Sequence, residues 1–269
     1  MKKVYPPDRR KEKNMLRSLK ELLGYELMAK DGHIGKVDDF FLNDEDWTVR
    51  YLVVDTGPWI FGRKVLITPQ ALLQPVWASE TFPVDLTREE VKTSPDIDVA
   101  KPVSREYEEK LFEHYSWPGY WSMSPSASGR PMYFPPNLIN HGDAVKKDEI
   151  KSHLRSATEI FNYSVDAVEG EVGSVKDFII DDETWQVHYM NVDLSKWLDS
   201  DKQILVALEW IGRIEVSANK VYINLPQDAV KYSPDFDANL PVNRQYEEVL
   251  YDYYGRPKYW QVMHESKQK

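Results

Sequence analysis

The sequence contains two similar halves, and this internal repeat limits the fold more than any other feature. Residues 16–55 match residues 154–193 at 18 of 40 positions, with a constant offset of 138. After one inserted residue near Trp197, residues 84–121 match residues 223–260 at 18 of 38 positions. Chance would give about 2 or 3 identities at ordinary residue frequencies. The chain therefore contains two copies of one small domain.

The repeat divides the 269 residues into five segments. We expect a basic N-terminal tail over 1–15, a first repeat over 16–121, a linker over 122–153, a second repeat over 154–260 and a short tail over 261–269. The linker is rich in proline and serine, which keep a segment extended and solvated. Two domains in 269 residues also agree with the usual size of a domain.

Each repeat is expected to begin with about five short strands. In the first repeat, residues 33–42 and 47–55 alternate apolar and polar side chains, which is typical of half-buried strands. A change of phase near Gly35 indicates a bulge. Residues 64–68 and 81–86 predict two further strands. Short strands at close turn spacing favour a small barrel.

Short helical segments accompany these strands. Residues 18–24 predict one helical turn with Ser18 as its N-cap, and Thr87 with Glu90 forms a capping box that predicts a second helix. Residues 104–115 place aromatic and aliphatic side chains on one helical face. The fold class predicted from the pattern is mainly β with α additions: two small β-barrels in tandem, each followed by short C-terminal helices.

Two matched segments resemble the PRC-barrel family. In the first repeat they are Leu16-Arg17-Ser18 with Gly32-His33-Ile34-Gly35-Lys36-Val37, and the strand that runs from Trp47 to Asp55; the second repeat carries their counterparts between Leu154 and Asp193. The resemblance covers residues 16–121 and 154–260. It implies two PRC-type barrels, and the segments ending in Pro-x-Tyr-Trp look like those of two-copy bacterial members.

The same resemblance implies a binding role. The family includes the cytoplasmic domain of the photosynthetic reaction-centre H subunit and a domain of a ribosome maturation factor, both of which suggest a protein-binding module. We expect this protein to lack the transmembrane helix of the first and the separate N-terminal domain of the second, so neither role transfers directly.

Composition excludes several classes of site. Without cysteine there are no disulfides, thiolate nucleophiles or zinc–thiolate centres. The net charge of −10 disfavours nucleic acid as a partner. No apolar run reaches the length of about 20 residues that spans a bilayer. The N-terminal residues lack the apolar segment of a signal peptide, so we expect a cytoplasmic protein.

The strongest candidates for chemistry are two pairs of aspartates that occupy matched positions in the repeats. Asp39 matches Asp177, and Asp55 matches Asp193. Paired carboxylates can perform acid–base work. Beside strand ends they can equally accept bonds from free backbone N–H groups, and we favour that structural interpretation. We predict no catalytic residues.

No metal or cofactor site is predicted. Asp38-Asp39 and Asn43-Asp44-Glu45-Asp46 lack the ligand spacing of an EF-hand, and a solvated hairpin turn explains the second group. His33 is replaced by Glu171, and His188 replaces Arg50, which favours exposed positions for these histidines.

Aromatic residues are the best candidates for contact with another protein. Tryptophan and tyrosine anchor many interfaces. The predicted interface residues are Trp59, Phe61, Tyr120, Trp121, Trp197, Tyr259 and Trp260. The alternative is that the rings near the end of each repeat pack over their own barrel.

The sequence thus predicts a non-catalytic interaction or scaffold module with an unidentified protein partner and no cofactor. We expect the two repeats to pack as a pseudo-twofold pair within the chain, with further homodimerisation as a weaker expectation. The alternatives are a sensor of a small ligand or metal, and an enzyme that uses the matched aspartates.

Overall fold

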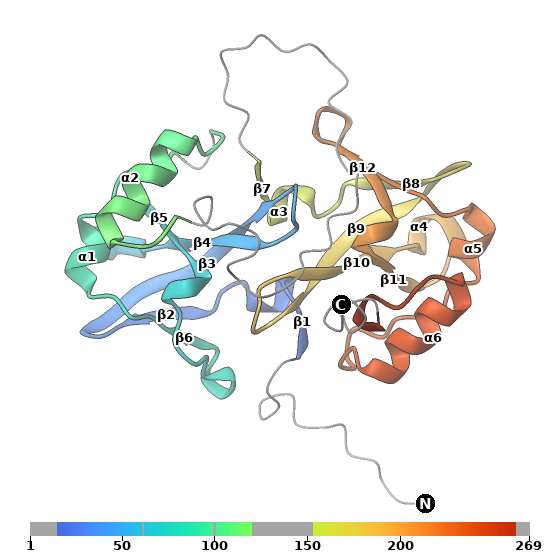
Figure 1. Cartoon of the computed structure of the whole chain (residues 1–269), viewed down its shortest axis with the longest axis horizontal. Helices are drawn as coiled ribbons and strands as arrows, with labels where there is room; N and C mark the ends of the chain where they lie inside the picture. Colours follow the sequence, from blue (N-terminus) through green and yellow to red (C-terminus); the bar gives the residue numbers. More distant parts are fainter. Residues whose placement is uncertain (1–14, 61, 99–100, 120–152, 262–269) are drawn as a thin grey trace, which may run out of the picture. The chain divides into compact units, whose positions relative to one another are not determined.

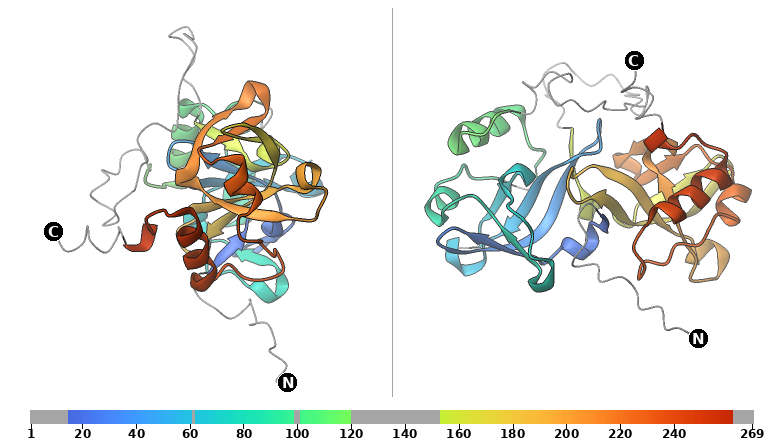
Figure 2. Two further views of the ribbon diagram at one scale, coloured as in Figure 1. Left: turned by 90° about the vertical axis from the view of Figure 1, so that its right-hand side faces the viewer. Right: turned by 60° about the horizontal axis from the view of Figure 1, so that its bottom comes forward.

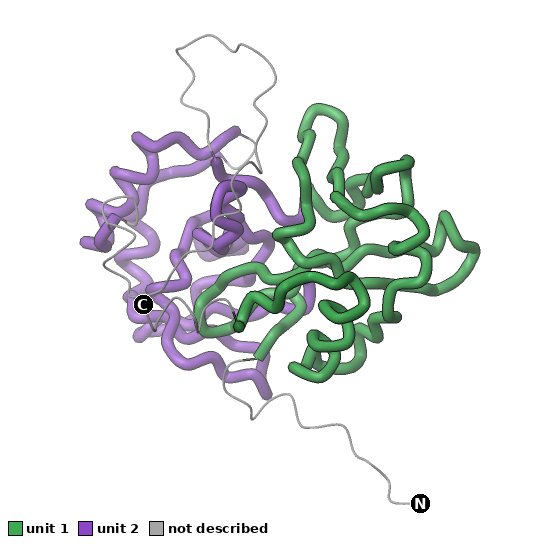
Figure 3. The backbone as a smooth tube through the Cα atoms, turned by 45° about the vertical axis from the view of Figure 1, so that its right-hand side comes forward, with its two compact units in different colours: residues 1–19, 135–139, 160–269 green, residues 20–134, 140–159 purple. Residues whose placement is uncertain are grey.

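The structure is a computed structural model that describes residues 15–60, 62–98, 101–119 and 153–261. It is mainly β, as predicted: two sheets contain more residues than the helices do, and short helices follow the strands of each repeat (Figure 1). The described residues fall into two compact units, coloured green and purple in Figure 3. Unit 1 contains residues 15–19 and 160–261, and unit 2 contains residues 20–119 and 153–159 as far as they are described.

Unit 2 is built around one six-stranded sheet. Its strand order is β5-β4-β3-β2-β6, and β7 pairs with β3 beside this path. The β2–β6 pair is parallel and the other pairs are antiparallel. Its strands are β2 (Glu26–Ala29), β3 (Gly32–Asn43), β4 (Val49–Asp55), β5 (Lys64–Ile67), β6 (Thr81–Pro83) and β7 (Leu154–Ser156).

Short helices complete unit 2. Single 3-10 turns lie at η1 (Lys20–Leu22), η2 (Gly57–Ile60), η3 (Pro69–Ala71) and η4 (Trp77–Ser79), followed by helices α1 (Arg88–Lys92) and α2 (Arg105–Tyr115). The capping box predicted at α1 is confirmed, because the Thr87 side chain accepts from the Glu90 N–H and the Glu90 carboxylate accepts from the Thr87 N–H. Ser104 caps α2.

Unit 1 repeats this plan with one more strand. Its sheet order is β11-β10-β9-β8-β13-β12, and β1 pairs with β9 beside this path. Its strands are β1 (Leu16–Ser18), β8 (Ser164–Ala167), β9 (Gly170–Asp181), β10 (Val187–Asp193), β11 (Gln203–Ala207), β12 (Ile211–Glu215) and β13 (Lys220–Ile223). Its helical segments are α4 (Ser195–Leu198), η6 (Leu208–Trp210), η7 (Val216–Ala218), α5 (Gln227–Lys231) and α6 (Arg244–Tyr254), while α3 (Ala157–Ile160) lies where the chain passes between units.

The matched Gly-x-x-Gly segment has a physical reason at each glycine. Gly32 has φ +145°, a conformation that side chains rarely adopt. A Cβ at Gly35 would lie 2.1 Å from the carbonyl oxygen of Asp55, and one at Gly173 would lie 2.1 Å from that of Asp193. The ladder between β2 and β3 also shifts register between Leu27 and Met28, so the bulge expected near Gly35 is confirmed.

One boundary differs from the sequence prediction. Trp47, expected to begin a strand, instead has φ +56° and belongs to the turn, and β4 begins at Val49. The turn is held by Asn43, whose Oδ1 accepts from the N–H groups of Glu45 and Asp46. Trp185 repeats this conformation with φ +58°. The indole is buried in both turns although its backbone is not extended.

The two repeats exchange their first strands. Strand β1, from the first repeat, pairs antiparallel with β9 of the second repeat, and β7, from the second repeat, pairs antiparallel with β3 of the first. Each exchanged strand lies inside one compact unit together with the strand it pairs with. The units therefore do not coincide with the sequence repeats at their first strands.

Each exchanged strand occupies the same place on a long strand. One edge of β9 pairs with β10, while the other edge pairs with β8 over residues 170–174 and with β1 over residues 179–181. Strand β3 is arranged likewise, with β2 over 32–36 and β7 over 41–43. The exchanged strand thus continues the edge where the neighbouring hairpin strand ends.

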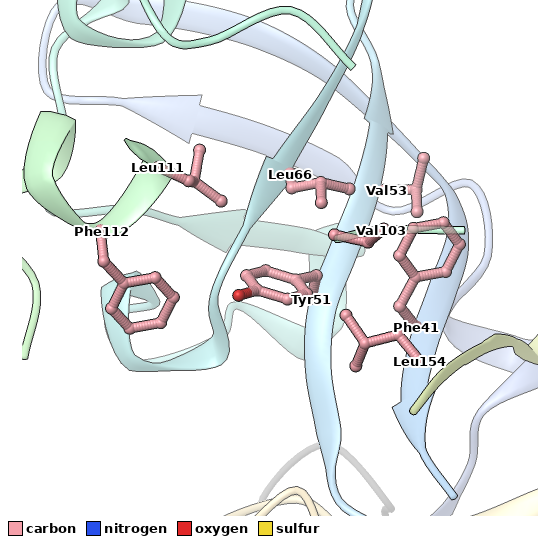
Figure 4. Close-up of a cluster of buried hydrophobic side chains, with 8 residues drawn as sticks. All are labelled: Phe41, Tyr51, Val53, Leu66, Val103, Leu111, Phe112 and Leu154. Carbon is pink, nitrogen blue, oxygen red and sulfur yellow. The ribbon is translucent and has the colours of Figure 1, made fainter. Parts of the chain in front are cut away.

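Apolar side chains of the exchanged strand take part in the core. Figure 4 shows a buried cluster of unit 2 whose members are Phe41, Tyr51, Val53, Leu66, Val103, Leu111, Phe112 and Leu154. Leu154 comes from β7, and only 8% of it is exposed. Burying a leucine side chain contributes about 1.5–3 kcal/mol, so the docking of β7 is part of the hydrophobic stabilisation of unit 2.

The last helix of each repeat covers a sheet. Figure 2 shows α6 beside the strands of unit 1, and the Tyr189 hydroxyl on β10 donates a 2.7 Å hydrogen bond to Glu247 on α6. In unit 2 the Tyr51 hydroxyl donates to Glu108 on α2 at 2.8 Å. Within the described residues the end strands of each sheet do not pair with each other, so neither hydrogen-bonded ladder is closed.

Candidate functional site

The predicted interface aromatics that the structure describes are half-buried. Trp59 lies in η2, and the Arg88 guanidinium stands 4.2 Å from the centre of its ring. Trp197 lies in α4, and Tyr259 and Trp260 follow α6. Phe61, Tyr120 and Trp121 lie outside the described residues. As an interface set, these seven residues remain a prediction.

Tyr259 and Trp260 pack against their own repeat. The Tyr259 hydroxyl donates to Glu247 at 2.9 Å, and the Trp260 ring lies edge-on to Tyr251 with 5.2 Å between centroids. The guanidinium of Arg244 sits 4.1 Å above the Trp260 ring. These contacts follow the alternative considered from the sequence, in which the terminal rings pack over the domain that carries them.

Glu247 is the centre of a buried polar cluster beneath those rings. It is 2% exposed, accepts from Tyr189 and Tyr259, and forms an ion pair with Arg244 at 3.0 Å. Burial raises the pKa of Tyr189 and of Tyr259, and the charge of Glu247 raises both further. A carboxylate with three such partners is satisfied, and it fixes α6 to the sheet.

His188 does not lie in the exposed environment expected from its replacement of Arg50. Its ring packs against Tyr259 with 4.9 Å between centroids, and burial lowers its pKa to about 4. Arg50 is also largely covered, since its side chain is 15% exposed and pairs with Asp46. The expectation that His188 is exposed was wrong. His188 and Arg50 occupy matched positions that are both largely covered, but His188 packs against an aromatic ring while Arg50 forms an ion pair.

The matched aspartates Asp39 and Asp177 hold the exchanged strands. Asp39 Oδ2 accepts from the Ser156 hydroxyl at 2.5 Å, and its Oδ1 accepts from the N–H groups of Phe40 and Thr158. Asp177 accepts from the Ser18 hydroxyl and from the Phe178 N–H. Burial raises the pKa of Asp39, and these hydrogen bonds oppose that rise.

A second pair of acidic residues binds the arginine of each exchanged strand. Arg17 Nε lies 2.5 Å from Asp182, and Arg155 Nε lies 2.7 Å from Asp44. The hairpin turn that contains Asp44 is therefore not simply solvated, as the sequence interpretation proposed. Asp44 belongs to the anchor of a strand from the other repeat, while Asp46 pairs with Arg50 of its own repeat.

Asp55 and Asp193 have a different role, in the turns that follow β4 and β10. Asp55 Oδ1 accepts from the Gly57 N–H at 2.8 Å, and Asp193 Oδ1 accepts from the Ser195 N–H at 2.9 Å. The bonding to backbone N–H groups expected for these residues is confirmed. In each unit, one matched aspartate therefore anchors an exchanged strand and the other caps a turn.

Sequence reasoning missed the apolar surface on α5 and α6 of unit 1, here called the helical patch. It consists of Tyr232, Val249 and Tyr253, which are 67%, 53% and 41% exposed. Val249 and Tyr253 are four residues apart on α6 and so share a face. The Tyr253 hydroxyl donates to the Ala229 carbonyl of α5 at 2.9 Å. The pKa of Tyr253 is raised, mainly by burial and to a smaller extent by the neighbouring Tyr232.

The first repeat is polar at the same three positions, which are Thr93, Lys110 and His114. Lys110 pairs with Glu106 at 2.7 Å. A ring nitrogen of His114 lies 2.8 Å from the Glu90 carbonyl, which is the counterpart of the Ala229 carbonyl. The geometry is thus common to both repeats, while the apolar character belongs to the second. These replacements, visible in the aligned repeats, were the available signal.

Unit 2 has an apolar surface of its own, here called the strand patch: Met28, Leu73 and Val76, which are 37%, 50% and 46% exposed. Met28 pairs with Pro83 across β2 and β6, and the Leu73 N–H donates to the Pro83 carbonyl from the other side. Val76 bridges to Thr81. The second repeat has Asp166, Gly212 and Glu215 at these positions, so this surface is also present in one repeat alone.

The described residues contain neither a metal-binding cluster nor a membrane-spanning helix. No group of three or more histidine, aspartate or glutamate side chains there could hold a metal ion. In the same part of the chain, no helix has both the length and the apolar character needed to cross a membrane.

Comparison with known families agrees with the repeat and the fold. Residues 16–76 and residues 154–230 match the sequence pattern of the PRC-barrel domain family. Together these two segments make up slightly more than half of the chain. No curated protein matches the chain. The two matched segments begin at Leu16 and Leu154, the first residues of the exchanged strands. The chain belongs to the PRC-barrel domain family, and it carries that domain twice.

Proposed function

We propose that this protein is a non-catalytic interaction module that joins different protein partners through its two repeats. One observation carries the proposal: the two copies of one fold expose apolar side chains at positions that do not correspond. The helical patch lies on the second repeat, and the strand patch lies on the first. Exposed apolar side chains grouped on a surface often mark sites of protein association.

The matched aspartates support a structural rather than an enzymatic interpretation. Asp39 and Asp177 are occupied by the serines of the exchanged strands, and Asp55 and Asp193 by turn N–H groups. A general base needs a free position toward its substrate. The hydrogen bonds of all four carboxylates serve the fold.

The repeats themselves supply variants that test the proposal. In the helical-patch variant, Tyr232→Thr, Val249→Lys and Tyr253→His introduce the residues that the first repeat carries on the same backbone. In the strand-patch variant, Met28→Asp and Val76→Glu introduce those of the second repeat. Each set has a precedent in the chain, so loss of binding can be separated from loss of folding by circular dichroism.

The measurement is quantitative recovery of cross-linked partners from an extract of the source cells, with wild type and both variants as baits. We expect at least one partner to fall by about fivefold or more with one variant and to be retained with the other, since an anchoring side chain contributes more than about 1 kcal/mol. Identical partner sets for all three baits, or none above a bead control, would contradict the proposal.

A further inference from the structure

The slots that accept the exchanged strands recognise the same residues in both units. The serine of each strand donates to an aspartate, Ser18 to Asp177 and Ser156 to Asp39. The arginine of each strand pairs with a second aspartate, Arg17 with Asp182 and Arg155 with Asp44. The remaining residue, at the first position of each strand, is leucine in both cases.

The backbone pairing of the two slots is equally alike. Leu16, Arg17 and Ser18 lie opposite Asp181, Ile180 and Ile179, while Leu154, Arg155 and Ser156 lie opposite Asn43, Leu42 and Phe41. These opposing residues correspond to each other at the repeat offset of 138. The Asp182 N–H donates to the Met15 carbonyl, and the Asp44 N–H donates to the His153 carbonyl.

A slot can discriminate between two strands only if it binds them with different affinities. The contacts described above are the same for a strand of the same chain and for a strand of another copy, so they provide little difference in affinity. The choice of donor then depends on connectivity and on effective concentration. The connection is short, since β1 ends at Ser18 and η1 begins at Lys20. Strand exchange between identical chains is a low-cost route to a dimer, and short hinges favour it.

We propose that a second copy of this chain can fill these slots, so that the protein forms a dimer by reciprocal exchange of the Leu-Arg-Ser strands. In that dimer, β1 of each copy pairs with β9 of the other copy and makes the Ser18–Asp177 and Arg17–Asp182 contacts across chains. The apolar patches take no part, so the dimer does not depend on the proposed partner binding.

Cysteine pairs can report the exchange directly, because the chain has no cysteine. Leu16 lies opposite Asp181 in the β1–β9 ladder, a position between the hydrogen-bonded pairs Met15–Asp182 and Arg17–Ile180. Such pairs bring Cα atoms to about 4.5 Å, within the range of a disulfide. One copy carries Leu16→Cys with one tag, and a second copy carries Asp181→Cys with another. A disulfide between the two full-length chains then requires β1 of one copy to lie on β9 of the other.

The two single-cysteine proteins are unfolded together, refolded under mild oxidation at several concentrations and separated on non-reducing gels. We expect the linked product, as a ratio to unlinked chain, to rise about tenfold for a tenfold rise in concentration while monomer dominates, as mass action requires. Leu16→Cys mixed with Val168→Cys measures collisional disulfides, since Val168 is 70% exposed and outside the slot.

Leu154→Cys mixed with Asn43→Cys tests the other slot and replaces the first pair if a variant does not fold. Wild type refolded over the same concentrations provides a second measurement, and its sedimentation should show a dimer that increases with concentration. Linked product no greater than the Val168→Cys background for both slots, or wild type that remains monomeric throughout, would overturn the proposal.

Discussion

His188 shows how a residue can share a position with its counterpart and differ in environment. The first repeat has Arg50, which pairs with Asp46, and the second repeat has Thr184 in place of that aspartate. An arginine at position 188 would therefore lack this carboxylate. The imidazole instead packs against Tyr259 and Tyr189, and burial holds its pKa at about 4.

This shift predicts a loss of stability in mild acid. Because the folded-state pKa lies below the ordinary value of 6.5, the unfolded chain binds the proton first as the pH falls. The stabilisation from neutral His188 is complete above about pH 6.5 and is lost progressively toward pH 4. In urea unfolding, wild type should lose about 2 kcal/mol more than His188→Gln between pH 7 and pH 4.5. At pH 7, the difference in free energy of unfolding between wild type and His188→Gln measures the effect of the substitution that does not depend on protonation. If the two proteins lost stability in parallel as the pH falls, the lowered pKa assigned to His188 would be contradicted.

At the scale of elements, a three-residue strand is too short to be stable without side-chain anchors. The hydroxyl of Ser18 is one such anchor, because it donates to an aspartate that is 7% exposed. Ser156 donates likewise to Asp39, and its oxygen accepts from the Glu159 N–H at 3.0 Å at the start of the helical turn. Ser156 is therefore both an anchor of β7 and a cap of that turn.

Ser18→Ala should lower the free energy of unfolding by about 1.5–3 kcal/mol, the range for a hydrogen bond to a charged group. Ser156→Ala removes a cap as well as the anchor, and the loss of a cap alone costs about 1 kcal/mol. Urea titration followed by tryptophan fluorescence would measure both. Ser79→Ala, at an exposed serine, is the control. A Ser18→Ala variant as stable as this control would argue that the anchor contributes nothing.

The sequence predicted most elements because their local signals agree with the fold. The capping box at Thr87, the bulge at Gly35 and the helix over residues 105–115 each depend on neighbours within a few residues. The start of β4 was missed because Trp47 adopts a positive φ, which is uncommon for such a residue.

The strand exchange could not be predicted from the pattern. Asp39 and Asp177 occupy matched positions, and so do Asp44 and Asp182, so either Leu-Arg-Ser segment satisfies either slot. When both repeats contain both partners of a contact, the sequence does not indicate whether the contact forms within one repeat or between the two. The surface patches are different, because the replacement of Lys110 by Val249 and of Thr93 by Tyr232 was visible in the alignment of the repeats.

At the scale of the whole molecule, each half of the chain provides one strand to the sheet of the other half. The half before the linker carries β1, which completes the sheet of unit 1, and the half after it carries β7, which completes the sheet of unit 2. Cutting the chain between the repeats should therefore not separate them.

A protease site placed within residues 122–152 of the full chain would test this dependence. After cleavage we expect the two fragments to elute together in buffer. They should separate in less urea when Arg17→Ala and Arg155→Ala remove two anchors, since each partly buried ion pair loses one partner. Uncleaved protein treated in parallel is the control. Fragments that separate at once without denaturant would show that the exchanged strands do not hold the halves together.

The exchange also sets an order in time. A ribosome releases Leu16 long before Asp181, its partner 165 residues later, which corresponds to on the order of 10–30 s of synthesis. Until residues 154–156 have been made, the nascent first half has its own sheet but lacks β7, so the edge of β3 at residues 41–43 has no partner strand. Neither unit can be finished while translation is still within the first repeat. The nascent domain is therefore incomplete during this interval. Nascent chains made next to each other on one messenger RNA are close together while the edge of β3 is open, when it can accept a strand from another copy.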